Sequence, residues 1–331
     1  MTMNVEKVPF LCGFMDEVVI LSDGTVTTCC MDPLANNVFG NIYTDSFEEI
    51  ERRYIRNVEN VVEDVHSMPR CTICYNKIAD SGFKPGRYKL DFSAQERSEF
   101  LDKYSSLNQL VIEPSSICNL KCNGCMQQRF DIPSHRKAAM LDMEKAFSFL
   151  KEKLGQIKLI RLYNYGETFL NKQSIPFIDS VKKHSPATYI HIATNGLMLN
   201  THEKRRKIVE SGVDRLTFSI HGGSQESVEP YMTKVFRFDN MLEILKDLSS
   251  IKKEHGKEQP VLEWKYLLFE WNDSDEEIAK AIALVEEIGL DSIVFVLPGY
   301  PSPSKRFKDA PEKIKTIRRD LMPAAKSIKS E

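Results

Sequence analysis

The sequence predicts an α/β protein in which a small cysteine-rich segment precedes a parallel sheet with crossover helices. Two observations lead to this prediction. From residue 106 onward, short apolar runs typical of strands alternate with amphipathic stretches whose apolar residues recur every three or four positions. All 8 cysteines lie at or before position 125, so the chemistry that cysteines usually support is concentrated in the first part of the chain.

Length and charge narrow the class of protein. With 331 residues and a net charge of -2, the chain is long enough for about two domains, and neither nucleic acid nor a membrane is an expected partner. No apolar run approaches the roughly 20 residues of a spanning helix, and the first ten residues lack the features of a signal peptide. We therefore expect a cytoplasmic protein whose cysteines serve metal or redox chemistry rather than disulfides.

The N-terminal segment predicts a hairpin followed by a helix. The strand-like runs 17–21 and 26–30 are separated by an Asp23-Gly24 turn. A helix is expected next, with Asp45 or Ser46 as its N-cap and glutamates in its first turn. The charged stretch 87–104 is expected to be a connector into the second domain.

Six strands are expected in the second domain, with a helix between most neighbours. In sheets of this kind, chemistry is found where strands end, so the residues that follow each strand are site candidates. The predicted strands are Gln109 to Ile112, Ile157 to Leu162, Tyr189 to Ala193, Arg215 to Ser219, Leu262 to Phe269 and Ser292 to Val296.

Cys118, Cys122 and Cys125 form a C-x3-C-x2-C motif shortly after the first of these strands. Three thiolates on one tight loop can ligate three corners of a 4Fe-4S cluster, which leaves one iron open to an exogenous ligand. The alternative is a structural zinc loop. Zinc normally takes four protein ligands, however, and no histidine stands at zinc spacing beside this motif.

The motif resembles that of the radical S-adenosylmethionine (radical SAM) superfamily. The resemblance implies a partial (β/α)6 barrel, S-adenosylmethionine bound at the open iron, and its reductive cleavage to a 5'-deoxyadenosyl radical that takes a hydrogen atom from a small-molecule substrate. It also implies a one-electron reductant such as flavodoxin or ferredoxin. One departure is Gly124, because the residue before the third cysteine is often aromatic in this superfamily and stacks on adenine.

Several strand ends carry residues that the same resemblance marks as functional. The run from Tyr163 to Glu167 is similar to the superfamily's Gly-Gly-Glu motif, with Tyr165 in place of the first glycine. By that match Glu167 binds the ammonium group of the cofactor, which a carboxylate suits because it only accepts hydrogen bonds. The expected cofactor-binding residues are Gly166, Glu167, Thr194, Asn195, Ser219 and Lys265, and His221 is a candidate proton carrier.

The N-terminal cysteines resemble the auxiliary-cluster module called SPASM, or its shortened twitch form. The C-x2-C pair Cys71 and Cys74, together with Cys12 and Cys29, would hold one further 4Fe-4S cluster. Cys30 is then left over and is a candidate hydrogen-atom donor to a substrate radical, although the roles of Cys29 and Cys30 could be reversed. A zinc ribbon built from the same four cysteines is the alternative.

These inferences divide the chain into the auxiliary module with its connector at 1–104, the barrel at 105–300 and a tail at 301–331. The expected reaction is oxidation or epimerisation of a polar, sugar-like small molecule. A peptide maturase that crosslinks or epimerises a ribosomal peptide is the second candidate. An iron-sulfur electron carrier is the non-enzymatic alternative, but it would not need Glu167 beside an open iron.

Overall fold

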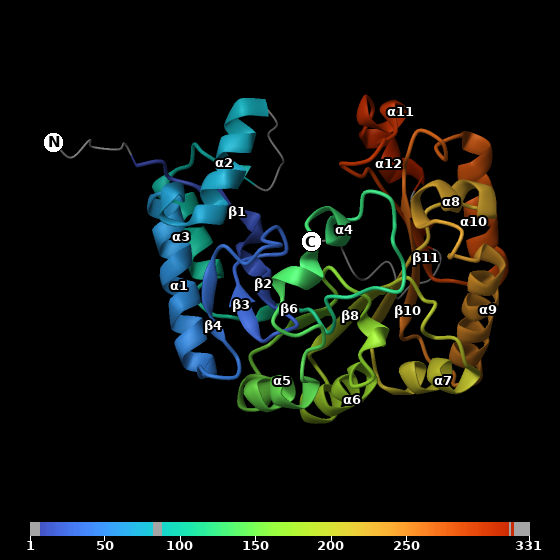
Figure 1. The fold of residues 1–331 in the computed structure, drawn as a ribbon, viewed down its shortest axis with the longest axis horizontal. Helices are drawn as coiled ribbons and strands as arrows, with labels where there is room; N and C mark the ends of the chain where they lie inside the picture. The colour runs from blue at the N-terminus through green and yellow to red at the C-terminus, as the bar shows by residue number, and fades with distance from the viewer. Residues whose placement is uncertain (1–6, 82–87, 318, 321–331) are drawn as a thin grey trace.

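The computed structural model describes residues 7–81, 88–317 and 319–320. Within these residues, ten strands form one sheet in the order β12-β11-β10-β9-β8-β7-β6-β2-β3-β4. Figure 1 shows the sheet curved into an open half-barrel, with helices around its convex side and the short helix α4 above its concave side. The predicted α/β class with a parallel sheet is confirmed.

The six predicted barrel strands are present and run parallel to one another, whereas β12 at the outer edge pairs antiparallel with β11. Their ends differ from the predicted ones by no more than two residues. They are β6 Gln109–Ile112, β7 Leu159–Leu162, β8 Tyr189–Thr194, β9 Arg215–Ser219, β10 Val261–Leu267 and β11 Ser292–Val296.

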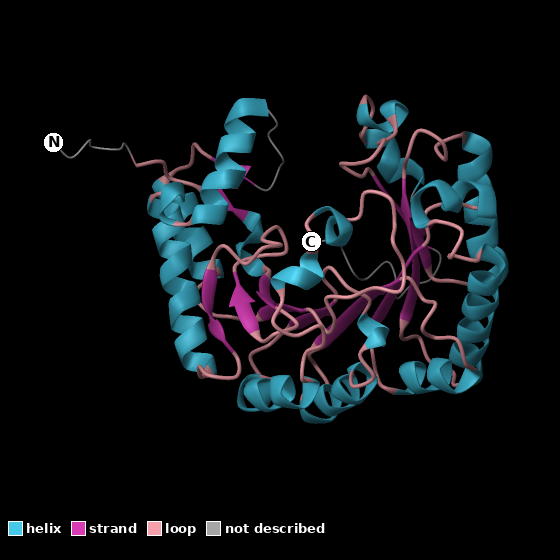
Figure 2. Cartoon of the chain, viewed as in Figure 1, coloured by secondary structure: helices cyan, strands magenta, loops and turns pink. Residues whose placement is uncertain are grey.

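Helices pack on the convex face of the sheet (Figure 2). Alternate strand residues such as Ile190 and Trp264 are fully buried there, and Trp264 contacts Phe238 with 6.1 Å between ring centroids. The barrel helices are α4 Met126–Arg129, α5 Met143–Leu150, α6 Ser174–His184, α7 His202–Glu210, α8 Gln225–Met232, α9 Phe238–Glu254 and α10 Asp275–Ile288. Shorter 3-10 turns are η3 Ile132–His135, η4 Lys151–Lys153 and η5 Thr168–Leu170.

The N-terminal segment contains the predicted hairpin and helix. Ser46 is the cap of α1, because its side chain accepts from the Glu49 amide while the Glu49 carboxylate accepts from the Ser46 amide. The elements are β1 Leu11–Cys12, η1 Gly13–Asp16, β2 Val18–Ile20, β3 Thr25–Thr27, β4 Val38–Asn41, α1 Phe47–Glu63, η2 Val65–Ser67, α2 Pro69–Ser81 and β5 Tyr88–Lys89.

The hairpin does not stand apart from the barrel. Strand β2 pairs in parallel with β6, so that Val19 lies opposite Val111, and β3 and β4 continue the same sheet outward. The predicted module and the predicted barrel therefore share one hydrogen-bonded sheet.

Two parts of the chain differ from, or extend, the expectations. The expected connector contains helix α3 Ala94–Lys103, which the sequence pattern missed because its residues are mostly polar. Its start is fixed by a second capping box, between Ser93 and Glu96. The tail forms α11 Lys305–Lys308, α12 Glu312–Ile317 and β12 Arg319–Asp320, whereas residues 321–331 of the expected tail lie outside the described residues.

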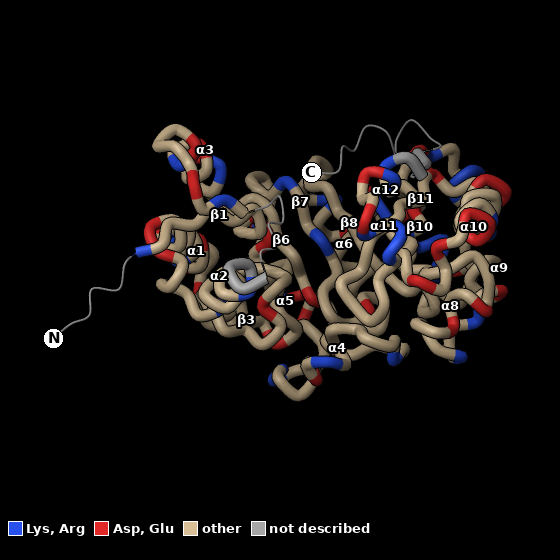
Figure 3. Tube along the Cα trace, turned by 90° about the horizontal axis from the view of Figure 1, so that it is seen from above, with Lys and Arg blue, Asp and Glu red and all other residues tan. Residues whose placement is uncertain are grey.

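Charged residues of both signs are spread over the described helices. Figure 3 shows basic and acidic residues interspersed along the helices rather than gathered by sign. No helix in the described part of the chain is long and apolar enough to cross a membrane.

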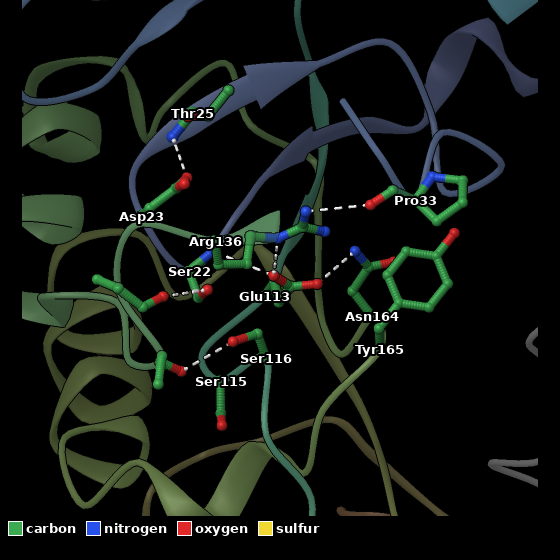
Figure 4. Close-up of polar contacts among 12 residues, drawn as sticks. Ser22, Asp23, Thr25, Pro33, Glu113, Ser115, Ser116, Arg136, Asn164 and Tyr165 are labelled. Atoms are coloured by element: carbon green, nitrogen blue, oxygen red, sulfur yellow. Dashed lines mark hydrogen bonds and ion pairs between the residues drawn. The ribbon is translucent and has the colours of Figure 1, made fainter. Parts of the chain in front are cut away.

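A fully buried ion pair joins the N-terminal segment to the barrel (Figure 4). The Arg136 Nε atom lies 2.9 Å from Oε1 of Glu113, and both side chains are 0% exposed. Glu113 also accepts from the Ser22 amide and from Nδ2 of Asn164, while Nη1 of Arg136 donates to the Pro33 carbonyl. The pair therefore holds five chain segments together.

We expect Arg136→Met to lower the free energy of unfolding by about 3 to 5 kcal/mol, because it leaves the Glu113 carboxylate buried without its counter-charge. Adding Glu113→Gln should recover much of that loss, since no buried charge remains. Lys183→Met is the control: it breaks an exposed pair with Asp179 and should cost about 0.5 kcal/mol or less. Chemical denaturation measures all three, and equal losses for Arg136 and Lys183 would contradict the prediction.

Candidate active site

The C-x3-C-x2-C loop follows β6 and leads into α4, at the carboxyl end of the parallel strands. Its three thiols are close enough for their charges to interact. Burial raises the pKa of Cys118 to about 11 and that of Cys122 to about 12. The Sγ atom of Cys118 accepts from the Leu120 amide at 3.4 Å and from Nδ2 of Asn195 at 3.6 Å. These donors would stabilise a metal-bound thiolate.

Glu167 is held beside this loop by a close approach of two backbones. A Cβ at Gly166 would lie 2.0 Å from the Ser115 carbonyl oxygen, so only glycine fits there. The Glu167 amide then donates to the Ile117 carbonyl at 2.9 Å, one residue before the first cysteine of the motif. The two predicted motifs are thus neighbours in space.

The Glu167 carboxylate is 2% exposed and accepts only from neutral groups. Its donors are the Thr194 hydroxyl at 2.6 Å, the Asn195 amide at 2.9 Å and the Phe169 amide at 3.1 Å. Burial raises the pKa of Glu167, and no basic side chain among the described residues forms an ion pair with it. A buried carboxylate without a counter-charge is costly, so this position fits the ammonium group of an amino-acid-like cofactor.

Gly124 lies against an aromatic ring from a distant part of the chain. Its φ is +82°, and a Cβ there would be 2.5 Å from the Tyr300 ring, which follows β11. The Arg129 guanidinium lies 4.6 Å from the centroid of the same ring, and the Tyr300 side chain is 48% exposed. Tyr300 thus fills the space into which a side chain at position 124 would project. Sequence reasoning missed this residue because the contact depends on how the sheet curves.

Ser219 and Lys265 lie opposite each other in the register of β9 and β10, on the concave face. Burial lowers the pKa of Lys265. His221 lies just beyond β9, where its Nδ1 accepts from the Leu267 amide at 3.3 Å and its ring packs edge-on against Tyr231. Burial and then Lys265 lower the pKa of His221 to about 3, so the imidazole is neutral at ordinary pH. Its role as a proton carrier stays a prediction.

Four N-terminal cysteines surround one small cavity of about 20 Å³, and they are Cys12, Cys29, Cys71 and Cys74. Burial raises the pKa of Cys29 and of Cys71 to about 12. Cys30 is not part of this lining. Its thiol donates to Oε2 of Glu17 at 2.7 Å, and its carbonyl accepts from the Tyr165 hydroxyl. The structure therefore groups Cys29, rather than Cys30, with the other three cysteines.

A single zinc ion and an iron-sulfur cluster place their thiolate ligands differently. Among the described residues, no group of three or more His, Cys, Asp or Glu side chains converges as a single metal ion requires. A zinc ion would draw all its thiolates to about 2.3 Å from one centre. An iron-sulfur cube instead binds each thiolate to a different iron. Metal analysis of the reconstituted protein distinguishes the two.

Two sequence profiles match the chain. The radical SAM superfamily profile matches residues 112–257, and the profile of SPASM, an iron-sulfur cluster-binding domain, matches residues 12–75. The second match covers the four cysteines that line the cavity, and the first covers the C-x3-C-x2-C loop together with the ends of β7, β8 and β9.

Curated relatives are distant. The GTP 3',8-cyclase of Peptoclostridium acidaminophilum is 26% identical over 71% of this chain and 69% of its own length. The GTP 3',8-cyclase of Aquifex aeolicus is 28% identical over 44% of this chain and 45% of its own length. The tungsten-containing aldehyde ferredoxin oxidoreductase cofactor-modifying protein of Pyrococcus furiosus is 27% identical over 46% of this chain and 42% of its own length. The chain thus spans less than half the length of two of these relatives. A solved structure of methylornithine synthase aligns with 60% of this chain and 58% of its own at 16% identity and a TM-score of 0.42.

We expect anaerobically reconstituted protein to hold about eight irons, because seven cysteines complete one four-ligand and one three-ligand site. Cys29→Ala should lower the iron content or change the electronic spectrum of the auxiliary cluster. Cys30→Ala, its sequence neighbour, is the matched control and should leave both unchanged. About four irons together with one zinc per chain would instead make the N-terminal site a zinc ribbon.

Proposed function

Because the chain belongs to the radical SAM superfamily and carries a SPASM-type domain ahead of its barrel, we propose that it activates S-adenosylmethionine at a 4Fe-4S cluster held by Cys118, Cys122 and Cys125. The substrate is a polar small molecule that enters the concave side of the barrel. When bound, the cluster and the cofactor supply a radical that takes a hydrogen atom from a substrate carbon.

The observation that supports this proposal most strongly is the buried Glu167 carboxylate beside Cys118. It has lone-pair capacity left after three neutral donors, so it would bind the cofactor's ammonium group. Thr194 holds the carboxylate in place. Asn195 contributes twice, through its amide to Glu167 and through its side chain to the Cys118 sulfur. Hydrogen bonds to a cluster sulfur influence the reduction potential of the cluster.

The fate of the substrate radical depends on which group reacts with it next, the auxiliary cluster or the Cys30 thiol. Cys12, Cys29, Cys71 and Cys74 would hold an auxiliary cluster, which could accept one electron while the substrate loses a proton, giving oxidation. Alternatively the Cys30 thiol returns a hydrogen atom to the carbon, giving epimerisation. The resulting sulfur radical would need one electron, which an auxiliary cluster held by the four cysteines would supply, and one proton, which Glu17 would relay from solvent to the thiol.

The contact between Cys30 and Glu17 favours the second outcome. A thiol that donates a hydrogen bond to a carboxylate at 2.7 Å has a proton acceptor and source within reach. The Tyr165 hydroxyl fixes the Cys30 backbone from the barrel side, so the thiol lies where module and barrel meet. In either outcome a flavodoxin or ferredoxin would serve as the one-electron reductant.

Glu167→Gln should weaken S-adenosylmethionine binding by about 10- to 150-fold, the worth of a charged hydrogen bond. Equilibrium binding to the reconstituted protein measures this, with Glu203→Gln on the exposed face of α7 as the matched control. The triple variant of Cys118, Cys122 and Cys125 to Ala should form no 5'-deoxyadenosine. Cleavage that persists in the triple variant would overturn the proposed function.

Cys30→Ala should keep 5'-deoxyadenosine formation but abolish inverted product, and Glu17→Gln should slow repeated turnover because the thiol is reprotonated less readily. In deuterated water, wild-type protein should place deuterium on the inverted carbon. An oxidised product without label would assign the reaction to the auxiliary cluster instead. Labelled, inverted product from Cys30→Ala would exclude Cys30 as the donor.

A further inference from the structure

The concave face of the barrel is lined by polar side chains rather than by a hydrophobic filling. Across β8 to β11, a hydrogen-bonded chain runs from His191 through Thr217 and Glu263 to Ser292. The alternate residues of these strands are the apolar ones that pack under the helices. The polar series therefore faces the barrel interior.

Cations gather around His191 in this interior. The pKa of His191 is lowered to about 3, first by burial and then by three nearby cations, Arg215, Arg161 and Lys265. Arg161 and Arg215 lie directly opposite His191 in the strand register. Lys265 lies one strand further along the sheet, opposite Ser219 and therefore nearer the strand ends. Two arginines thus flank one neutral imidazole, and a lysine on the next strand lies close enough to act on it electrostatically.

Arg215 has donors that nothing in the described part of the chain satisfies. The residue is 8% exposed, and its Nε and Nη2 atoms are buried without a hydrogen-bond partner. The hydroxyl of Tyr189, on the adjacent strand, is also buried and unsatisfied among the described residues. Unsatisfied buried donors of a charged group are costly, so this arrangement calls for an acceptor.

The carboxylates that face this interior do not balance the three cations. Glu263 lies 3.6 Å from Nη1 of Arg215, but its oxygens already accept from Thr217 and Ser292. Glu17 faces the same space near Tyr163, and it accepts from the Cys30 thiol. Three cations against two carboxylates leave a positive excess inside a partly closed barrel, where charge is poorly screened.

We propose that Arg161, Arg215 and Lys265 bind an anionic group of the substrate, a phosphate or a carboxylate, in the interior of the barrel. This inference rests on the proposed function only in identifying the bound molecule as the substrate. The guanidinium groups would bind the oxygens of the anion through paired N–H donors, and the Tyr189 hydroxyl would add a further donor.

The position of Arg215 also limits where the anion lies. It begins β9, whereas Ser219 ends the strand, and five strand residues rise by roughly 13 Å between the first and the last. Because Lys265 lies opposite Ser219, an anion bound by both Arg215 and Lys265 would lie between the two ends of the strand. A substrate that carries such a group is a charged molecule, like a nucleoside phosphate or a phosphorylated sugar, rather than a small neutral alcohol.

Binding of inorganic pyrophosphate, citrate and a neutral disaccharide to the reconstituted protein tests this inference by calorimetry at low salt. Wild-type protein should bind pyrophosphate or citrate, and which of the two it prefers distinguishes phosphate from carboxylate. Arg215→Gln and Lys265→Gln should each weaken anion binding by about tenfold or more. Arg206→Gln, on the exposed surface of α7, is the matched control and should have no effect.

Two measurements keep this test separate from the proposed function and from misfolding. Arg215→Lys keeps the charge and should retain part of the affinity, and Arg215→Gln should bind S-adenosylmethionine as the wild type does. No anion binding by the wild type, affinities unchanged in all variants, or equal binding of the neutral disaccharide would overturn the anion site. None of these results would affect cofactor cleavage, whose failure would instead remove the proposed function.

Discussion

The buried ion pair between Glu113 and Arg136 fixes the two cysteine-bearing parts of the chain against each other. Glu113 lies directly after β6 and just before the cluster loop. Arg136 lies shortly after that loop and donates to the carbonyl of Pro33, which follows Cys29 and Cys30 in the sequence. Charges without access to water tolerate little displacement, because each loses its only compensation. The separation of the two proposed cluster sites is thereby tied to one salt bridge.

The charge of the buried side chain also distinguishes the candidate cofactor site from the barrel interior. Glu167 is a buried anion that accepts from neutral donors, whereas Arg215 is a buried cation whose Nε and Nη2 atoms find no acceptor among the described residues. Each site is electrostatically incomplete in the opposite sense. A cofactor that offers an ammonium group and a substrate that offers an anion would complete both, and neither would be stable in the other's place.

Much of this arrangement follows from local sequence, and the exceptions have physical causes. The barrel strands were predictable because apolar runs such as Leu110 to Ile112 are bounded by polar residues, and the C-x3-C-x2-C spacing identified the cluster loop. Cys29 and Cys30 could not be separated, because they lie in a turn that follows β3, where the Asp32 amide donates to the Cys29 carbonyl, and only tertiary packing decides which thiol faces the other cysteines.

Long-range contacts were the other exception. Tyr300 reaches Gly124 only because the curved sheet brings the end of β11 back to the cluster loop, and no local pattern reports that curvature. The unsatisfied donors of Arg215 are likewise invisible in sequence, since an arginine that begins a strand usually reaches solvent. Helix α3 was missed for a local reason, because a capping box can begin a helix whose apolar face is weak.

The pairing of β2 with β6 has a consequence for how the protein is made. The hairpin of β2 and β3 leaves the ribosome well before residues 109–112, so in the nascent chain β2 presents an open edge of backbone donors and acceptors. That edge is closed only when the first barrel strand emerges and docks in parallel. The cysteines of the N-terminal segment are therefore synthesised before β6, the strand against which their hairpin pairs. Iron is inserted at these cysteines either after β6 has paired with β2 or while the sheet is still incomplete.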